Sequence, residues 1–172
     1  GFAIKSNGGA NNTHYQGSQN VSQSPGSIDK NIGPGRTYHP NVIIINLGVN
    51  NMSGVADSVV FAKDNILNLR DMILDMHARE PSARFVICTI TPADTGVSTR
   101  YRRFFSFRQP LGAMCRNLQA NGVLLTIADT FSALGANVTD LFDGLHPTTV
   151  GYNKMGDAIS TALALVAGYT YP

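Results

Sequence analysis

Short apolar runs alternate with longer amphipathic segments along most of this chain. The apolar runs cover residues 42–47, 85–91 and 123–128, a length typical of β-strands. The amphipathic segments, at about 55–78, 99–121 and 149–167, carry apolar residues at helical spacing. The stripes expected to face inward are Phe61, Ile66, Leu69, Met72, Ile73 and Met76 in the first segment and Met155, Ile159, Leu163 and Val166 in the last. Alternating strands and helices predict a doubly wound, three-layer α/β/α sandwich around a mostly parallel sheet.

The run at 42–47 is rich in β-branched residues and lacks charge, which predicts a strand buried on both faces of the sheet. Gly48 ends this run, and Asn50 follows just beyond its carboxyl end. In open parallel sheets that edge is where ligands bind, so Asn50 is a candidate site residue. An ordinary turn would also place Gly and Asn at these positions.

The N-terminal part of the sequence has a different character. Residues 1–5 predict a short strand, and residues 6–40 are rich in Gly, Asn, Ser and Gln with little apolar periodicity. We expect irregular structure there, because a loop of that length in a compact domain is usually functional or disordered.

Length and composition describe one globular domain. The chain has 172 residues, of which 43% are hydrophobic and 14% charged. A net charge of +2 favours neither nucleic acid nor a membrane as a partner, and no apolar run is long enough to span a bilayer. Gly1 is not an initiator methionine, so we expect a processed or cut end there.

Two cysteines, Cys88 and Cys115, are too few for a disulfide framework. They could meet between a strand and the following helix, or both could be buried free thiols. Asn-x-Ser/Thr sequons, together with the low charge, predict a secreted glycoprotein; they begin at Asn11, Asn20, Asn51 and Asn137.

The segment at 143–147, Asp-Gly-Leu-His-Pro, carries the clearest candidate chemistry. The Asp143 carboxylate, three residues before His146, can bond the imidazole Nδ1 and leave the other nitrogen free to act as a general base. We expect Phe142 and Leu145 to pack inward and hold this loop in place. The alternative is a surface histidine beside an N-terminal carboxylate.

Taken with Gly48-Val49-Asn50-Asn51, this segment resembles the SGNH hydrolases, the GDSL-type esterases and lipases. In that family a Gly-x-Asn-Asp block supplies an oxyanion-hole asparagine, and a late Asp-x-x-His-Pro block supplies two members of a catalytic triad. A Gly-Tyr pair such as the one at 151–152 is also usual there. The resemblance covers nearly the whole chain and implies the flavodoxin-like sheet of that fold. The sequence departs from the family at Asn51, where Asp is usual, and Asn50 itself is unaffected.

The resemblance implies roles for four residues. His146 would be the general base, Asp143 its orienting partner, and Asn50 an oxyanion donor. The segments at 14–17 and 25–28 resemble the two halves of the His-Glu-Gly-x-x-Gly block of carbohydrate-acting members, in which a glycine N–H also serves the oxyanion hole. We assign that role to Gly26, with Gly17 as the alternative.

The family's nucleophile is a serine in a Gly-Asp-Ser block after its first strand, and no such block occurs in this sequence. The contexts of Ser6 and Ser53 do not fit the role. We therefore expect a single domain over 1–172 that lacks the family's first strand, which normally lies inside the sheet. Since an unpaired buried backbone group costs about 1–3 kcal/mol, the strand would be supplied by a longer chain or a bound N-terminal peptide. The remaining possibility is a relative without the serine that has reclosed its sheet.

The sequence thus predicts a serine esterase acting on small acyl esters, acetyl esters of carbohydrates in particular, as in acetylxylan esterases. No metal or cofactor is implied, because the histidines lack ligand spacing. One alternative is a catalytically inactive carbohydrate-binding protein that kept the site without the nucleophile. Another is a lysophospholipase-like enzyme.

Arginines interleaved with aromatic residues between 99 and 108 would fit an anionic polymer. A solvated amphipathic turn is the commoner reason for such a pattern. The arginines are Arg100, Arg102, Arg103 and Arg108.

Overall fold

The computed structural model describes residues 33–35, 38–48, 58–91, 98–135 and 138–166 of the chain. The strands are β1 (Val42–Ile45), β2 (Arg84–Cys88) and β3 (Leu125–Ala128). The helices are α1 (Ser58–Arg79), α2 (Ser98–Ala120), α3 (Thr130–Leu134) and α4 (Thr149–Ala164), with a 3₁₀ helix, η3, at Val138–Asp140. The predicted alternation of strands and helices is confirmed from β1 onwards, and α3 is an addition to it.

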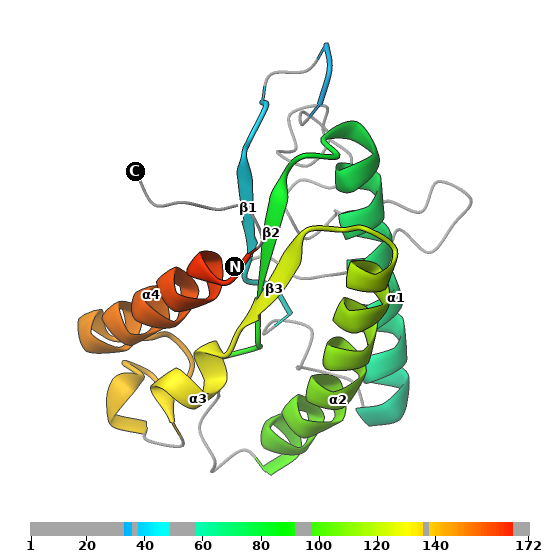
Figure 1. Ribbon diagram of the computed structural model, residues 1–172. Helices are drawn as coiled ribbons and strands as arrows, with labels where there is room; N and C mark the ends of the chain where they lie inside the picture. Colours follow the sequence, from blue (N-terminus) through cyan, green and yellow to red (C-terminus); the bar gives the residue numbers. More distant parts are fainter. Residues whose placement is uncertain (1–32, 36–37, 49–57, 92–97, 136–137, 167–172) are drawn as a thin grey trace.

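The three strands form a parallel sheet in the order β1-β2-β3. Val42 of β1 pairs with Arg84 of β2, and Phe85 of β2 pairs with Leu125 of β3. Figure 1 shows α1 and α2 on one side of this sheet and α4 with α3 on the other. The predicted three-layer α/β/α architecture is therefore confirmed.

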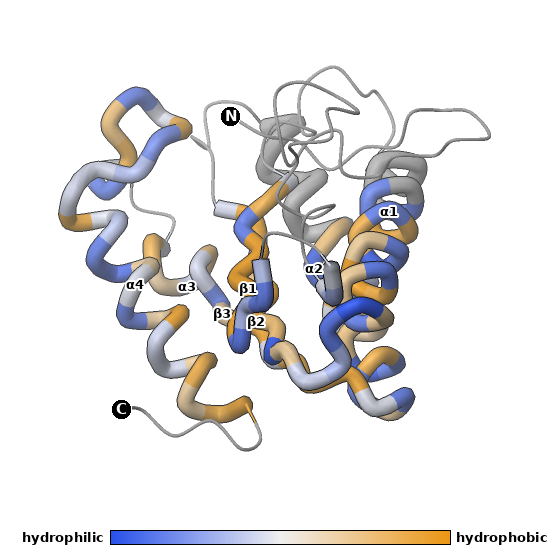
Figure 2. Tube along the Cα trace, turned by 90° about the horizontal axis from the view of Figure 1, so that it is seen from above, coloured by the Kyte–Doolittle hydropathy of each residue, from blue (hydrophilic) through white to orange (hydrophobic). Residues whose placement is uncertain are grey.

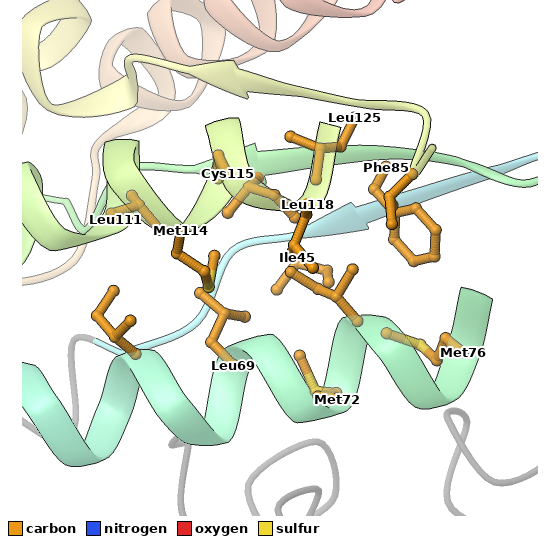
Figure 3. Close-up of a cluster of buried hydrophobic side chains, with 14 of the residues drawn as sticks. Ile45, Leu69, Met72, Met76, Phe85, Leu111, Met114, Cys115, Leu118 and Leu125 are labelled. Carbon is orange, nitrogen blue, oxygen red and sulfur yellow. The ribbon is translucent and has the colours of Figure 1, made fainter. Parts of the chain in front are cut away.

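The larger core fills the space between the sheet and the helices α1 and α2 (Figure 3). The described side chains of the predicted α1 stripe, from Ile66 to Met76, are all at most 9% exposed. The α2 residues that meet them are Phe107, Leu111, Met114, Cys115 and Leu118. Helix α2 continues through Pro110, although proline inside a helix costs about 3 kcal/mol. Buried Phe107 and Leu111 on either side of it supply the packing that offsets this cost.

The smaller core joins α4 to the sheet. Its buried members are Val86, Cys88, Ala128, Ala162, Leu163 and Val166, which come from β2, β3, α4 and the residues just after α4. Figure 2 shows the three strands, largely in hydrophobic colours, between the two groups of helices. As predicted, Met155, Leu163 and Val166 are buried, and Ile159 packs partly buried against this core.

The prediction that β1 is buried on both faces is wrong. Ile43 and Ile45 contact the larger core, but Ile44, on the opposite face, is 50% exposed. The described part of α4 packs on β2 and β3, and its core includes only Val42 from β1. An apolar run in the sequence predicts a strand, but whether each face of that strand is buried depends on where the helices pack on the sheet.

The two cysteines lie in different cores. Cys88 belongs to the core on the α4 side, and Cys115 to the core on the α1 and α2 side. Both are buried free thiols, which decides between the two alternatives left open by the sequence. Burial raises the pKa of each thiol to about 12, so neither is a ready nucleophile.

Several predictions concern residues outside the described part of the chain. They are the strand at 1–5, most of the loop at 6–40 and the asparagines of the four sequons. Among the described helices, none combines the length and the hydropathy that crossing a bilayer requires.

Candidate active site

A short antiparallel backbone pairing closes the loop that contains Asp143 and His146. Leu141 and Pro147 form an antiparallel bridge. On one side of it the Phe142 N–H donates to the His146 carbonyl oxygen at 2.7 Å, and on the other the Thr148 N–H donates to the Asp140 carbonyl oxygen at 2.8 Å. The chain reverses through Gly144, whose φ of 78° is easy for glycine and strained for most other residues.

Asp143 holds His146 through both of its carboxylate oxygens. Its Oδ1 accepts the backbone N–H groups of Leu145 at 3.1 Å and His146 at 2.8 Å. Its Oδ2 lies 2.7 Å from the His146 Nδ1. An ionised carboxylate only accepts hydrogen bonds, so Nδ1 carries the proton and Nε2 keeps its lone pair. The predicted Asp–His pairing is present, with an imidazole side chain that is 65% exposed.

Hydrogen bonding also sets the ionisation of Asp143. The backbone N–H of His146, followed by its ring nitrogen, lowers the pKa of the Asp143 carboxyl from 3.8 to about 2. The carboxylate is therefore charged wherever an imidazole can act as a base. Its charge favours the imidazolium that forms when Nε2 accepts a proton.

The first turn of α4 packs against this loop. The Thr148 hydroxyl caps the helix by accepting the Gly151 N–H at 3.2 Å. A Cβ on Gly151 would lie 2.5 Å from the Asp140 carbonyl oxygen and 3.1 Å from Pro147. The absence of a side chain at 151 therefore lets the helix and the loop pack closely.

Asp140 is a supporting residue that the sequence analysis missed. It is 5% exposed, and its Oδ2 accepts a hydrogen bond from the Lys154 Nζ at 2.6 Å. This pair ties the base of the loop to the second turn of α4. No short sequence pattern could indicate it, because the two residues are too far apart in the chain for an i, i+4 contact.

Phe142 does not pack inward to hold the loop in place, contrary to prediction. It is 83% exposed, whereas the adjacent Leu141 is 8% exposed and takes the inward position. Leu145 is half-buried. Successive residues of a ladder point to opposite faces, so a one-residue error in the expected register exchanges the inward and outward side chains.

A second aspartate stands where β3 ends. The Asp129 Oδ1 accepts the Ser132 N–H at 3.1 Å and caps α3, and it also accepts the Thr89 hydroxyl at 3.2 Å. Its Oδ2 accepts from the Ser132 hydroxyl at 2.7 Å and from the Arg108 guanidinium at 2.8 Å. Burial raises the pKa of Asp129, but these hydrogen bonds and the Arg108 charge outweigh it, so the net shift is downward.

Asp129 and the Asp143–His146 loop lie on the side of the molecule where the strands of the sheet finish (Figure 1). Thr89, Thr91 and Thr130 are buried polar residues just after β2 or β3. Figure 1 shows α3 and the orange segment that leads into α4 on the same side of the molecule as these strand ends. An exposed base held by a carboxylate, next to the carboxyl edge of a parallel sheet, has the arrangement of a hydrolase site.

The family follows from a comparison with known proteins. Residues 7–154 match the GDSL-like lipase/acylhydrolase family. The chain belongs to this family. The resemblance to SGNH hydrolases, first indicated by the Asp-x-x-His-Pro segment, is thereby confirmed. A comparison with curated protein sequences found no match.

Solved structures with the same fold include GDSL-like enzymes. A carbohydrate esterase family 3 protein from Talaromyces cellulolyticus is 20% identical, with a TM-score of 0.60 over 73% of this chain and 57% of that one. An acetylxylan esterase from Geobacillus stearothermophilus, solved as a catalytic mutant, is 15% identical, with a TM-score of 0.56 over 72% and 59% of the two chains. A GDSL-like lipase from Bacteroides thetaiotaomicron is 20% identical, with a TM-score of 0.51 over 72% and 64%. This chain thus spans about three fifths of the length of each.

Two of the four site residues predicted for this GDSL-like protein lie outside the described part of the chain. They are Asn50 and Gly26, and Gly17 lies outside it as well. The turn that leads to Asn50 is described as far as Gly48, which is buried and has a φ of 114°. The side chains of the arginine-rich segment are described only from Phe107, and there Arg108 pairs with Asp129. Within the described residues, no group of three His, Cys, Asp or Glu side chains could hold a metal ion.

Proposed function

We propose that this protein is a serine esterase that hydrolyses small acyl esters. The observation that carries the proposal is the Asp143–His146 pair, in which the carboxylate binds Nδ1 and leaves the Nε2 lone pair free on a side chain that is 65% exposed. Membership of the GDSL-like lipase/acylhydrolase family supports it. The proposal therefore joins a local geometry to a family in which acyl transfer is the expected chemistry.

The proposed reaction has two stages. In the first, a serine hydroxyl attacks the ester carbonyl, its proton passes to the His146 Nε2, and the alcohol leaves with that proton. In the second, water attacks the acyl-serine and gives a proton to Nε2; the bond to the serine oxygen then breaks, that oxygen takes the proton back from Nε2, and the acid is released. Asp143 keeps the imidazole oriented throughout and stabilises its charged form.

We assign the oxyanion hole to Asn50 and the Gly26 N–H, with the N–H of the serine itself. Donors of this kind act mainly in the transition state, where charge collects on the carbonyl oxygen. Asn50→Ala should therefore lower kcat by about 10²–10³-fold with little change in KM. A change confined to KM would instead mean that Asn50 binds the ground-state substrate.

We further propose that the nucleophilic serine belongs to polypeptide outside Gly1–Pro172, either in a longer chain or in a bound peptide. The sequence contains no Gly-Asp-Ser block, β1 is an edge strand of the described sheet, and Ile44 within it is half exposed. A further parallel strand paired along β1 would bring its own carboxyl end to the edge of the sheet where β1, β2 and β3 finish, and a helix connected to it could cover the face that holds Ile44.

A fluorophosphonate probe tests the enzyme class and the location of the serine together. We expect one covalent label per active molecule, mapped by mass spectrometry to a serine outside these 172 residues. A label on Ser6, Ser53 or another serine of this sequence would contradict the proposed location. A folded protein that neither reacts with the probe nor cleaves any ester would instead be the inactive carbohydrate-binding alternative.

For the substrate, we propose an acetyl group on a carbohydrate. The support is the resemblance of residues 14–17 and 25–28 to carbohydrate-acting family members, together with the shared fold of carbohydrate and acetylxylan esterases. Acetylated xylan should then be deacetylated, and p-nitrophenyl esters should react more slowly as the acyl chain lengthens. A rate that rises with chain length would favour a lipase or lysophospholipase.

A further inference from the structure

The ladder that holds His146 also fixes the position of Phe142. Leu141 and Pro147 are bridge partners, so the next pair toward the turn is Phe142 opposite His146, joined by the 2.7 Å bond from the Phe142 N–H. Residues directly opposite in an antiparallel ladder project to the same face, with Cβ atoms about 5 Å apart. The exposures agree, because Leu141 is buried at 8% while Phe142 and His146 both project outward.

The backbone beneath Phe142 is held from both sides. Leu141 is buried next to it, and Asp140, the residue before that, is tied to Lys154. On the other side Asp143 accepts two backbone N–H groups of the turn. A ring with two side-chain torsions on such a backbone loses little conformational entropy when a ligand covers it.

From this geometry we propose that Phe142 is a specificity-determining residue that packs against the leaving alcohol of the ester. The inference rests on the proposed esterase function, in which the His146 Nε2 protonates the leaving oxygen and so lies within about 3 Å of it. An alcohol in that position is within reach of a ring whose Cβ is about 5 Å from that of His146. The acyl group lies on the other side of the scissile bond, away from this contact.

The chemistry around Phe142 favours a sugar ring as that alcohol. The phenyl ring is 83% exposed and offers a flat apolar surface, while Asp143 and His146 beside it present charged and polar groups. A pyranose has the matching character, because its C–H faces can stack on an aromatic ring while its hydroxyl groups bond to polar neighbours. A small alcohol such as methanol has no face with which to cover the ring.

The test compares two acetyl esters that differ only in the alcohol, methyl acetate and a mono-acetylated methyl xylopyranoside. Phe142→Ala should lower kcat/KM for the sugar ester by about tenfold, mainly through KM, and change methyl acetate hydrolysis by less than about twofold. Phe142→Tyr, which keeps the ring, should restore the sugar ester. Leu165→Ala is the matched control, because Leu165 is 74% exposed at the far end of α4, and it should change neither rate.

A binding measurement keeps this inference separate from the proposed function. In a His146→Ala background, which should not turn the ester over, saturation-transfer NMR should detect the acetylated sugar, and adding Phe142→Ala should weaken its binding by about tenfold. Failure of the wild type to cleave any ester would overturn the esterase proposal, and this binding result would then decide the role of Phe142 alone. Equal losses on both esters, losses that follow the acyl chain, or an unchanged sugar affinity would each overturn the role proposed for Phe142.

Discussion

Asp129 and Asp143 share one local hydrogen bond and differ in the other groups that they bind. Each carboxylate accepts the backbone N–H of the residue three positions later, Ser132 in one case and His146 in the other. Asp129 also binds the hydroxyls of Ser132 and Thr89 and the Arg108 guanidinium, so its second oxygen is used within the fold. The second oxygen of Asp143 binds the Nδ1 of an imidazole whose side chain is largely exposed.

An aspartate three residues before its hydrogen-bond partner is therefore not catalytic by spacing alone. Both carboxyls have a lowered pKa. At Asp129 burial raises the pKa, but hydrogen bonds from the Ser132 hydroxyl and backbone, with the Arg108 charge, outweigh it; at Asp143 the His146 backbone N–H is the largest cause. Only Asp143 binds a side chain, the His146 imidazole, that can act as a general base. We therefore expect Asp129 to act on stability and Asp143 to act on catalysis.

Exchanging each carboxylate for an amide should separate the two roles most widely. Asp143→Asn should lower kcat for p-nitrophenyl acetate by about 10⁴-fold, because the amide can favour the wrong imidazole tautomer. Asp129→Asn should leave kcat within about threefold, which corresponds to roughly 0.6 kcal/mol of activation free energy. Equal losses in the two variants would remove the distinction between the two sites.

The contact between α4 and the Asp143 loop can be tested through two glycines of the same helix. Gly151→Ala should lower the free energy of unfolding by about 1–3 kcal/mol, because the new Cβ would meet the Asp140 carbonyl oxygen. Gly156→Ala, with nothing within 4 Å of its Cβ, should raise it by about 0.5–1 kcal/mol. Urea denaturation of both variants measures the difference, and a neutral Gly151→Ala would contradict the close packing.

Removing the Asp129 carboxylate should destabilise the fold. Asp129→Ala takes away the N-cap of α3 and the partner of Arg108, and we expect a loss of about 1–2 kcal/mol in the free energy of unfolding. The estimate stays low because the Asp129 side chain is 38% exposed and the ion pair is partly screened by solvent. The same substitution at Asp143 should cost less stability, which thermal unfolding of the two variants would show.

The smallest effect concerns the titration of Asp143. Its folded pKa of about 2 lies below the ordinary 3.8, so the interaction with His146 stabilises the fold above pH 3.8 and is lost as the pH falls toward 2. In His146→Ala the backbone N–H remains but the imidazole is gone, so the carboxyl pKa should rise part of the way back. Carbon-detected NMR of the carboxyl group follows this shift, and an unchanged midpoint would mean that the imidazole does not contribute.

Much of the fold and the Asp143–His146 pair could be predicted from the sequence. Helical periodicity and short apolar runs located α1, α2, α4 and the three strands, because long amphipathic segments carry a strong signal. The Asp143–His146 pair was predictable for a different reason, since all of its contacts lie within four residues. Helix α3 was missed because five residues are too short to show a period.

The remainder depends on contacts between distant residues. Asp129 meets Arg108 and Thr89 only after α2, β2 and β3 have packed together, and Asp140 meets Lys154 across the start of α4. The exposure of Ile44 likewise depends on which strands α4 covers. The burial of Leu141 and the exposure of Phe142 depend on the pairing register set by the bridge between Leu141 and Pro147. No local sequence pattern carries this information.

Hydrolysis of p-nitrophenyl acetate by the His146→Ala variant tests the central claim most directly, since every proposed step passes a proton through the Nε2 of this residue. We expect kcat to fall by roughly 10⁵–10⁶-fold relative to the wild type, with the free energy of unfolding nearly unchanged because the side chain is 65% exposed. Turnover close to that of the wild type, in a variant shown to be folded, would contradict the assignment of His146 as the catalytic base.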